Sequence, residues 1–207
     1  MRILAFGDSI TYGGWDTDGG WVERIKRRAH SATIESKGAN KLQVFNLGIG
    51  GSTSARLLAR MELEIQNRYF AMWPFVFIIA VGTNDGRSVN GKPEVSLDEY
   101  KRNITHITTI AKKYTDKILF LGLPPLGEDS LDFKGQLYSD SVVENYNDAL
   151  EVIVRAEGIG FVPIRQLFES QPQNNLFAYD SLHPASKGHE IIAQAVIPYL
   201  EKFGIKF

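Results

Sequence analysis

The stretch Arg2-Ile3-Leu4-Ala5-Phe6-Gly7-Asp8-Ser9-Ile10-Thr11 places a short, continuous apolar run directly before a polar turn. Runs of this kind are typical of strands that are buried on both faces of a sheet. Four more follow along the chain, at residues 42–47, 75–81, 118–123 and 160–163. The sequence therefore predicts five strands, the first at residues 3–6.

Helical patterns fill the intervals between these runs. Two of them open with capping boxes, Ser96-Leu97-Asp98-Glu99 and Ser141-Val142-Val143-Glu144, and Gly158 offers a C-cap to the second. Strict alternation predicts an α/β fold with a parallel sheet and helices on both faces, and right-handed crossovers favour a five-stranded, flavodoxin-like strand order. No linker or repeat divides residues 1–207, so we expect one domain.

The carboxyl edge of the predicted sheet is where a ligand is expected. In open α/β sheets, ligands bind beyond the carboxyl ends of the strands, near the point where the strand order reverses. Ser9, Gly51 and Asn84 each follow the end of a predicted strand and should share this edge. Residues 12–20 and 126–140 are the segments least suited to regular structure, and we expect them to form the rim of a pocket there.

The composition limits the partners and cofactors. A net charge of −1 over 207 residues gives no field for binding nucleic acid or an anionic membrane surface. The absence of cysteine excludes disulfides, thiolate zinc sites and a cysteine nucleophile. No apolar run approaches the roughly 20 residues of a membrane span, and the start of the chain lacks the pattern of a secretory signal. We expect a cytoplasmic protein without a membrane span, and nothing in the sequence indicates an oligomeric state.

Ser9 and the segment Asp180-Ser181-Leu182-His183-Pro184 suggest nucleophilic catalysis. A serine hydroxyl needs a base to take its proton, and only four histidines are present. Three of them fall within or at the start of helical patterns, whereas His183 lies on a loop three residues after Asp180. In the catalytic interpretation, Ser9 attacks an ester carbonyl, His183 takes and returns the proton, and Asp180 fixes the tautomer. The alternative is a loop histidine that caps the last helix or fills a turn.

A tetrahedral intermediate also needs preorganised hydrogen-bond donors for its oxyanion. The sequence offers three, namely the backbone N–H of Ser9, the backbone N–H of Gly51 and the side-chain amide of Asn84. Glycine at position 51 allows the backbone to approach the oxyanion closely, and Ser52 is placed to cap the helix that follows.

These segments together resemble the SGNH (GDSL-type) hydrolases. All four family blocks occur in order over nearly the whole chain, as Gly7-Asp8-Ser9-Ile10-Thr11, Asn46–Thr53, Gly82-Thr83-Asn84-Asp85 and Asp180–Pro184. Only Ile10 departs, from the usual leucine. The resemblance implies a three-layer α/β/α sandwich and esterase, lipase, thioesterase or carbohydrate deacetylase activity without a metal. Ser9, Gly51, Asn84 and His183 match the name-giving residues of the family, with Asp180 completing the triad.

Residues that contact the substrate are predicted from their position alone. The candidates for a pocket wall lie in the two rim segments and are Trp15, Phe133, Leu137 and Tyr138, with simple packing as the alternative. Arg87 is expected to be a solvated loop arginine, with contact to a substrate carboxylate or sugar as the alternative. Asp8 is expected to accept backbone N–H groups at the turn rather than to take part in chemistry.

The sequence also contains fragments of other functional motifs. Residues 86–93 lack the Ser or Thr hydroxyl of a phosphate loop, and the 48–53 turn lacks the third glycine of a dinucleotide site. No metal or cofactor is implied. We expect a small-molecule ester as the substrate, with a short or medium acyl chain such as acetyl, although thioesters, lysophospholipids and sugar acetates would use the same residues. The rivals are a noncatalytic module that binds phosphate or nucleotide at residues 48–53, and an inactive, adaptor-type family member.

Overall fold

The main sheet has five parallel strands in the order β2-β1-β3-β6-β9. The computed structural model describes residues 1–133, 135–172 and 175–207. The strands are β1 Arg2–Gly7, β2 Gln43–Gly48, β3 Phe75–Ala80, β6 Ile118–Leu121 and β9 Gly160–Val162. Each coincides with one of the five apolar runs. Counted along the chain, the order is 2-1-3-4-5, which confirms the flavodoxin-like prediction.

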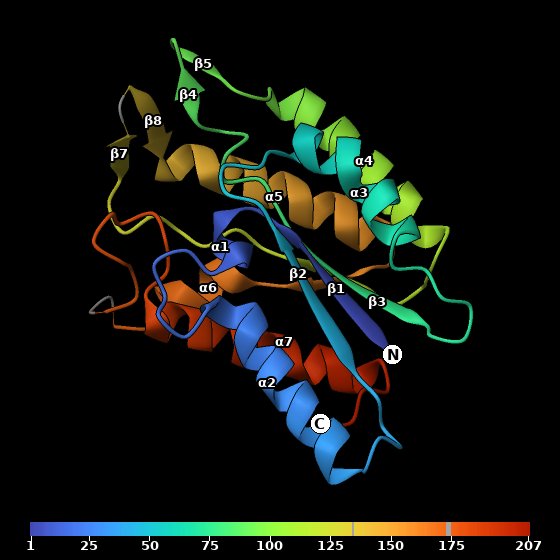
Figure 1. Ribbon diagram of the computed structural model, residues 1–207. Helices are drawn as coiled ribbons and strands as arrows, with labels where there is room; N and C mark the ends of the chain where they lie inside the picture. The colour runs from blue at the N-terminus through green and yellow to red at the C-terminus, as the bar shows by residue number, and fades with distance from the viewer. Residues whose placement is uncertain (134, 173–174) are drawn as a thin grey trace.

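Helices cover both faces of this sheet (Figure 1). One face carries α3 Ser54–Gln66, α4 Leu97–Lys112 and α5 Asp140–Ala156, and the other carries α2 Gly20–Glu35, α6 Ile164–Glu169 and α7 Ser186–Lys202. Successive residues of β1 alternate between the two cores, with Leu4 and Phe6 in the first and Ile3 and Ala5 in the second. Because both faces are buried, the strand has no polar alternation, and the three-layer α/β/α sandwich is confirmed.

A second, smaller sheet corrects the prediction for residues 126–140, which we expected to be irregular. Its strands pair antiparallel in the order β5-β4-β8-β7 and are β4 Ser88–Val89, β5 Lys92–Pro93, β7 Ser130–Phe133 and β8 Gln136–Ser139. These strands are too short and too polar to give a periodic signal, and the buried residues Leu131 and Tyr138 attach the β7–β8 hairpin to the first core.

Helix starts differ from the predicted caps at two of three positions. Ser96 caps α4 as predicted, accepting the N–H of Glu99. The Ser141 capping box is wrong, because α5 already begins at Asp140. The cap of α3 is Thr53 rather than Ser52, since the Thr53 hydroxyl accepts the N–H of Arg56.

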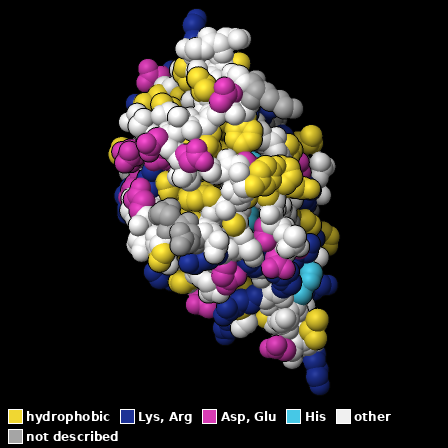
Figure 2. All heavy atoms as spheres, turned by 90° about the vertical axis from the view of Figure 1, so that its left-hand side faces the viewer, with side chains coloured by type: hydrophobic (Ala, Val, Ile, Leu, Met, Phe, Trp, Pro, Cys, Tyr) yellow, Lys and Arg dark blue, Asp and Glu magenta, His cyan; other side chains and the backbone are white. Residues whose placement is uncertain are grey.

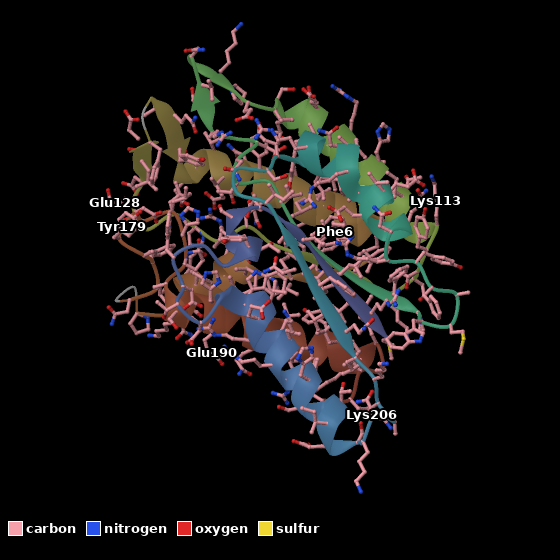
Figure 3. The ribbon with its side chains drawn as sticks, viewed as in Figure 1. Phe6, Lys113, Glu128, Tyr179, Glu190 and Lys206 are labelled. Carbon is pink, nitrogen blue, oxygen red and sulfur yellow. The ribbon has the colours of Figure 1, made fainter. Side chains whose placement is uncertain are left out.

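The carboxyl ends of the strands point toward the left of Figure 1, where the loops after β1, β2 and β3 meet. Gly7 allows this close approach, because a Cβ there would lie 2.0 Å from the Thr11 hydroxyl oxygen. Figure 3 shows Phe6 in the interior, whereas the exposed Tyr179 and Glu128 project at this edge. Within the described ranges, no helix combines the length and apolarity that crossing a bilayer requires.

Candidate active site

Ser9 stands at the junction of β1 and the one-turn helix α1 Ser9–Tyr12. Asp8 caps this turn, with its Oδ1 accepting the N–H of Ile10 at 3.0 Å, as expected for a turn-stabilising carboxylate. The Ser9 carbonyl accepts the N–H groups of Gly13 and Gly14. The turn therefore holds the Ser9 backbone from both sides and leaves its hydroxyl at the edge of the sheet.

His183 contacts both Ser9 and Asp180. Its Nε2 lies 2.8 Å from the Ser9 Oγ, and its Nδ1 lies 2.7 Å from the Asp180 Oδ2. The Asp180 side chain is 2% exposed and that of His183 is 11% exposed. An ionised carboxylate only accepts hydrogen bonds, so the Nδ1–H faces Asp180 and the Nε2 lone pair faces the serine hydroxyl. The structure thus brings the three residues predicted as a triad into one hydrogen-bonded chain.

The turn before His183 also affects the pKa of Asp180. The other oxygen of Asp180 accepts the backbone N–H groups of Leu182, at 3.1 Å, and of His183, at 3.0 Å. Burial alone would raise the pKa of Asp180, but these donors and the His183 ring outweigh it and hold the pKa below its ordinary value. Asp180 is therefore a carboxylate at neutral pH, ready to accept the imidazole proton.

Asn84 and Gly51 lie on the same cavity as Ser9. Gly51 has a φ of +70°, a conformation that glycine adopts without strain. The Asn84 Nδ2 donates to the Asp8 Oδ2 at 3.3 Å and to the Ser52 carbonyl at 3.2 Å. One of these two acceptors, the Asp8 carboxyl, is buried, and burial raises its pKa to about 6, with the N–H of Ile10 opposing the shift. The three residues predicted as oxyanion donors therefore share one site, with the Asn84 amide held by long bonds.

Trp15 divides the space around Ser9. One cavity, of about 540 Å³, is lined by Ser9, residues 12–17, Gly50 and His183. The other, of about 290 Å³, contains Gly51 and Asn84, with Phe133 and Tyr138 on its wall. Trp15 lines both, has a φ of 65° and meets the His183 ring edge-on at 5.9 Å. Figure 2 shows this face of the molecule, with hydrophobic side chains gathered near its middle.

Leu137 is not brought to either cavity. It is 50% exposed, and strand alternation turns it away from Tyr138 and Gln136, which both line the smaller cavity. Arg87 also lines this cavity, and the prediction of a solvated arginine is wrong, because its side chain is only 11% exposed and pairs with Glu94. Gln136 was missed because the small sheet that positions it leaves no sequence signal.

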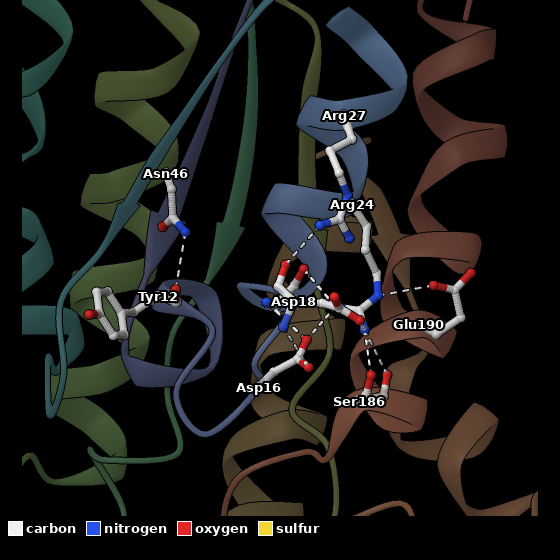
Figure 4. A network of polar contacts seen from close by, with 9 residues as sticks. Tyr12, Asp16, Asp18, Arg24, Arg27, Asn46, Ser186 and Glu190 are labelled. Carbon is white, nitrogen blue, oxygen red and sulfur yellow. Dashed lines mark hydrogen bonds and ion pairs between the residues drawn. The ribbon is translucent and has the colours of Figure 1, made fainter. Parts of the chain in front are cut away.

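The rim loop that carries Trp15 is anchored by an ionic network (Figure 4). Arg24 on α2 pairs with Asp16, whose side chain is buried, and donates to the Ser186 hydroxyl at 2.7 Å. It also pairs with Glu190 on α7 at 3.0 Å. Asp16 in turn accepts the N–H of Gly20 at 3.0 Å. The loop is therefore tied to two helices beneath it.

Comparison with known protein families identifies the family of this chain. The model of the GDSL-like Lipase/Acylhydrolase family matches residues 5–191, which include Ser9, Gly51, Asn84, Asp180 and His183. The chain belongs to this family. The neighbours of this GDSL-like protein include esterases and lipases.

Curated relatives of this GDSL-like protein are distant. An isoamyl acetate-hydrolyzing esterase of Schizosaccharomyces pombe is 23% identical over 97% of the chain and 75% of its own length. An uncharacterized lipoprotein of Bacillus subtilis, YqeF, is 27% identical over 61% of the chain. The matched region spans about half of the lipoprotein, at 49%.

Solved structures show the same fold at low identity. TesA superposes with a TM-score of 0.74 at 24% identity, covering 98% of this chain and 99% of that chain. Axe2, an acetylxylan esterase from Geobacillus stearothermophilus, gives a TM-score of 0.74 at 23% identity, covering 96% and 93%. These similarities establish the fold of the GDSL-like protein. Its substrate has to be inferred from the geometry of the site.

Proposed function

We propose that this GDSL-like protein is a serine esterase whose catalytic residues are Ser9, His183 and Asp180. The observation that carries the proposal is the continuous hydrogen-bonded chain from the Ser9 hydroxyl through the His183 ring to Asp180, with contacts of 2.8 and 2.7 Å. Nucleophile and base lie within hydrogen-bond reach, and a third group orients the base. A loop histidine with only a structural role would not need to contact both Ser9 and Asp180 in this way.

The reaction proceeds in two halves. His183 Nε2 takes the Ser9 proton as Oγ attacks the ester carbonyl, and the tetrahedral oxyanion accepts hydrogen bonds from the N–H groups of Ser9 and Gly51 and from Asn84 Nδ2. Collapse of the intermediate expels the alcohol, which takes the proton from His183. Water then attacks the acyl-enzyme with His183 again as the base, which releases the acid and restores Ser9.

Short acyl groups are the proposed substrates, acetyl esters first. The cavity that contains Gly51 and Asn84 measures about 290 Å³, which is at the small end for a ligand site. The fission yeast relative is named for the hydrolysis of an acetate ester, which agrees with this size. Thioesters and lysophospholipids would use the same triad. The cytoplasmic location stays a prediction from the sequence.

An acetylated carbohydrate is the second candidate substrate. The smaller cavity combines aromatic rings, from Trp15, Phe133 and Tyr138, with the polar groups of Gln136 and Arg87. Aromatic faces with flanking hydrogen-bond donors suit a polyhydroxylated alcohol better than a plain alkyl one. The acetylxylan esterase among the structural neighbours agrees with this choice.

The test is hydrolysis of p-nitrophenyl esters from acetate to dodecanoate, beside acetylated xylo-oligosaccharide, by the wild type and by Ser9→Ala. We expect Ser9-dependent hydrolysis that is fastest for acetate. A rate for Ser9→Ala equal to that of the wild type would refute the proposal. Faster release of acetate from the oligosaccharide than from the p-nitrophenyl ester would favour the second candidate.

A further inference from the structure

A hydroxyl group from the small sheet contacts the proposed oxyanion donor. The Tyr138 hydroxyl on β8 donates to Oδ1 of Asn84 at 3.0 Å, although 54 residues separate them. Tyr138 is 4% exposed, and its ring meets that of Phe133 edge-on at 6.1 Å. The packed ring therefore fixes where the hydroxyl stands.

Arg87 contacts the same Tyr138 hydroxyl. Its Nη1 donates to the Tyr138 oxygen at 3.3 Å, and a guanidinium has donors only. The single hydrogen of Tyr138 therefore points away from Arg87, and the Asn84 amide oxygen is the acceptor in its reach. Glu94 holds Arg87 in place through Nε and Nη2. Burial raises the pKa of Tyr138, with Arg87 opposing the shift, so the hydroxyl keeps its hydrogen at neutral pH.

The opposite end of the amide has acceptors only. Asn84 Nδ2 faces the Asp8 carboxyl at 3.3 Å and the Ser52 carbonyl at 3.2 Å. A flipped amide would set Oδ1 against these oxygens and leave the oxyanion without this donor. Both bonds are long for N–H···O, so the Nδ2 hydrogens remain available to a stronger acceptor such as an oxyanion.

We propose that Tyr138, supported by Arg87, is a positioning residue that holds the Asn84 carboxamide with its Nδ2 toward the oxyanion. This rests on the proposed function, because Tyr138 acts through Asn84 in that reaction. A hydrogen bond to Oδ1 also polarises the amide and strengthens its N–H as a donor. Since the oxyanion forms only in the transition state, loss of the hydroxyl lowers kcat and leaves KM unchanged.

Tyr138→Phe tests the role while keeping the ring. Removing an entire oxyanion donor lowers kcat by roughly 10²–10³-fold, and we expect about a tenfold loss when the donor remains but is less well oriented. KM for p-nitrophenyl acetate should stay within about twofold of wild type. Tyr199→Phe is the matched control, because that hydroxyl donates to the Phe161 carbonyl between α7 and β9 and should leave kcat unchanged. An unchanged kcat for Tyr138→Phe overturns the proposal.

A double-mutant cycle separates positioning from general structural damage. Once Asn84→Ala has removed the amide, adding Tyr138→Phe should cause no further loss of kcat. The same tenfold loss in both backgrounds overturns the proposal. If circular dichroism shows that Tyr138→Phe does not fold, Arg87→Met takes its place, with about a threefold loss of kcat expected that Asn84→Ala abolishes. An unchanged kcat for folded Arg87→Met then overturns it.

Failure of the proposed function gives a different result. Wild type and Ser9→Ala would then hydrolyse the ester at the same rate, and the positioning role would fall with the reaction it serves. Failure of the positioning role alone leaves a Ser9-dependent rate that Tyr138→Phe does not alter.

Discussion

His183 lies between two partners of opposite hydrogen-bonding character. Asp180 is a carboxylate that only accepts, whereas the Ser9 hydroxyl has a proton to give. The contacts of 2.7 and 2.8 Å leave one tautomer that satisfies both, and this tautomer is the one a general base requires. At the scale of single residues, the proposed reaction thus depends on Asp180 staying ionised, and its backbone donors help to lower its pKa.

Asp180→Asn tests this dependence. An amide at this position can donate to Nδ1 and stabilise the wrong tautomer, so we expect the fold to be kept while kcat falls by up to roughly 10⁴-fold. Esterase assays with circular dichroism of the same sample measure both. Ser181→Ala, which removes only a hydroxyl that donates to Glu128, is the neighbouring control. A kcat for Asp180→Asn close to that of Ser181→Ala would remove Asp180 from the mechanism.

Single residues were predictable where a short segment contains the whole signal. Asp180 and His183 lie three residues apart, and Ser9 follows an apolar run, so each could be found without the fold. Tyr138 could not, because its contact with Asn84 depends on a hairpin whose polar, four-residue strands have no recognisable pattern. Leu137 was chosen for its hydrophobicity, yet strand alternation turns it away from the cavity.

At the scale of elements, the strands were predictable because burial on both faces makes them continuously apolar. Helix starts were less predictable, since Thr53 caps α3 in place of its neighbour Ser52, and the N-cap residue of α5, Ser139, makes no side-chain cap. Asp140 is paired with Arg165 at 2.9 Å, which fixes the start of α5. The rim loop between α1 and α2 depends in the same way on Arg24, a residue of the following helix.

Arg24→Met should destabilise the protein through this loop. Asp16 would lose its ion pair while its side chain remains buried, with only backbone N–H partners left, and we expect the free energy of unfolding to fall by about 2–3 kcal/mol. Arg102→Met is the control, because Arg102 is exposed on α4, on the other face of the sheet, and should change stability by less than about 0.5 kcal/mol. Urea unfolding measures both. Equal stabilities of the two variants would contradict the anchoring role.

At the scale of the whole molecule, the two cores enclose ionisable groups that oppose each other in pH dependence. Burial raises the pKa of Asp8 to about 6 and that of Asp85 to about 7, so their contribution to stability is full below their unfolded pKa and is lost as the pH rises through these values. Burial lowers the pKa of His189 to about 4, with Asp16 opposing the shift. Its contribution is present above an ordinary pKa of 6.5 and is lost as the pH falls.

His189→Leu should therefore change the pH dependence of stability. At pH 5 the unfolded chain binds a proton at this histidine that the folded protein excludes, which costs about 2 kcal/mol relative to pH 8. Between pH 8 and pH 5, the unfolding free energy of the variant relative to that of the wild type should therefore rise by about 2 kcal/mol. His106→Leu, at an exposed position on α4, is the control. A difference that does not vary with pH would show that His189 titrates normally in the folded protein.

The central claim is that Ser9 is a nucleophile activated by His183, and covalent trapping tests it most directly. We would treat the wild type, Ser9→Ala and His183→Ala with a fluorophosphonate and measure intact mass and modified peptides. The account predicts one adduct per wild-type chain, located at Ser9, no adduct on Ser9→Ala, and strongly slowed labelling of His183→Ala. Equal labelling of Ser9→Ala, or a wild-type adduct at another residue, would contradict it.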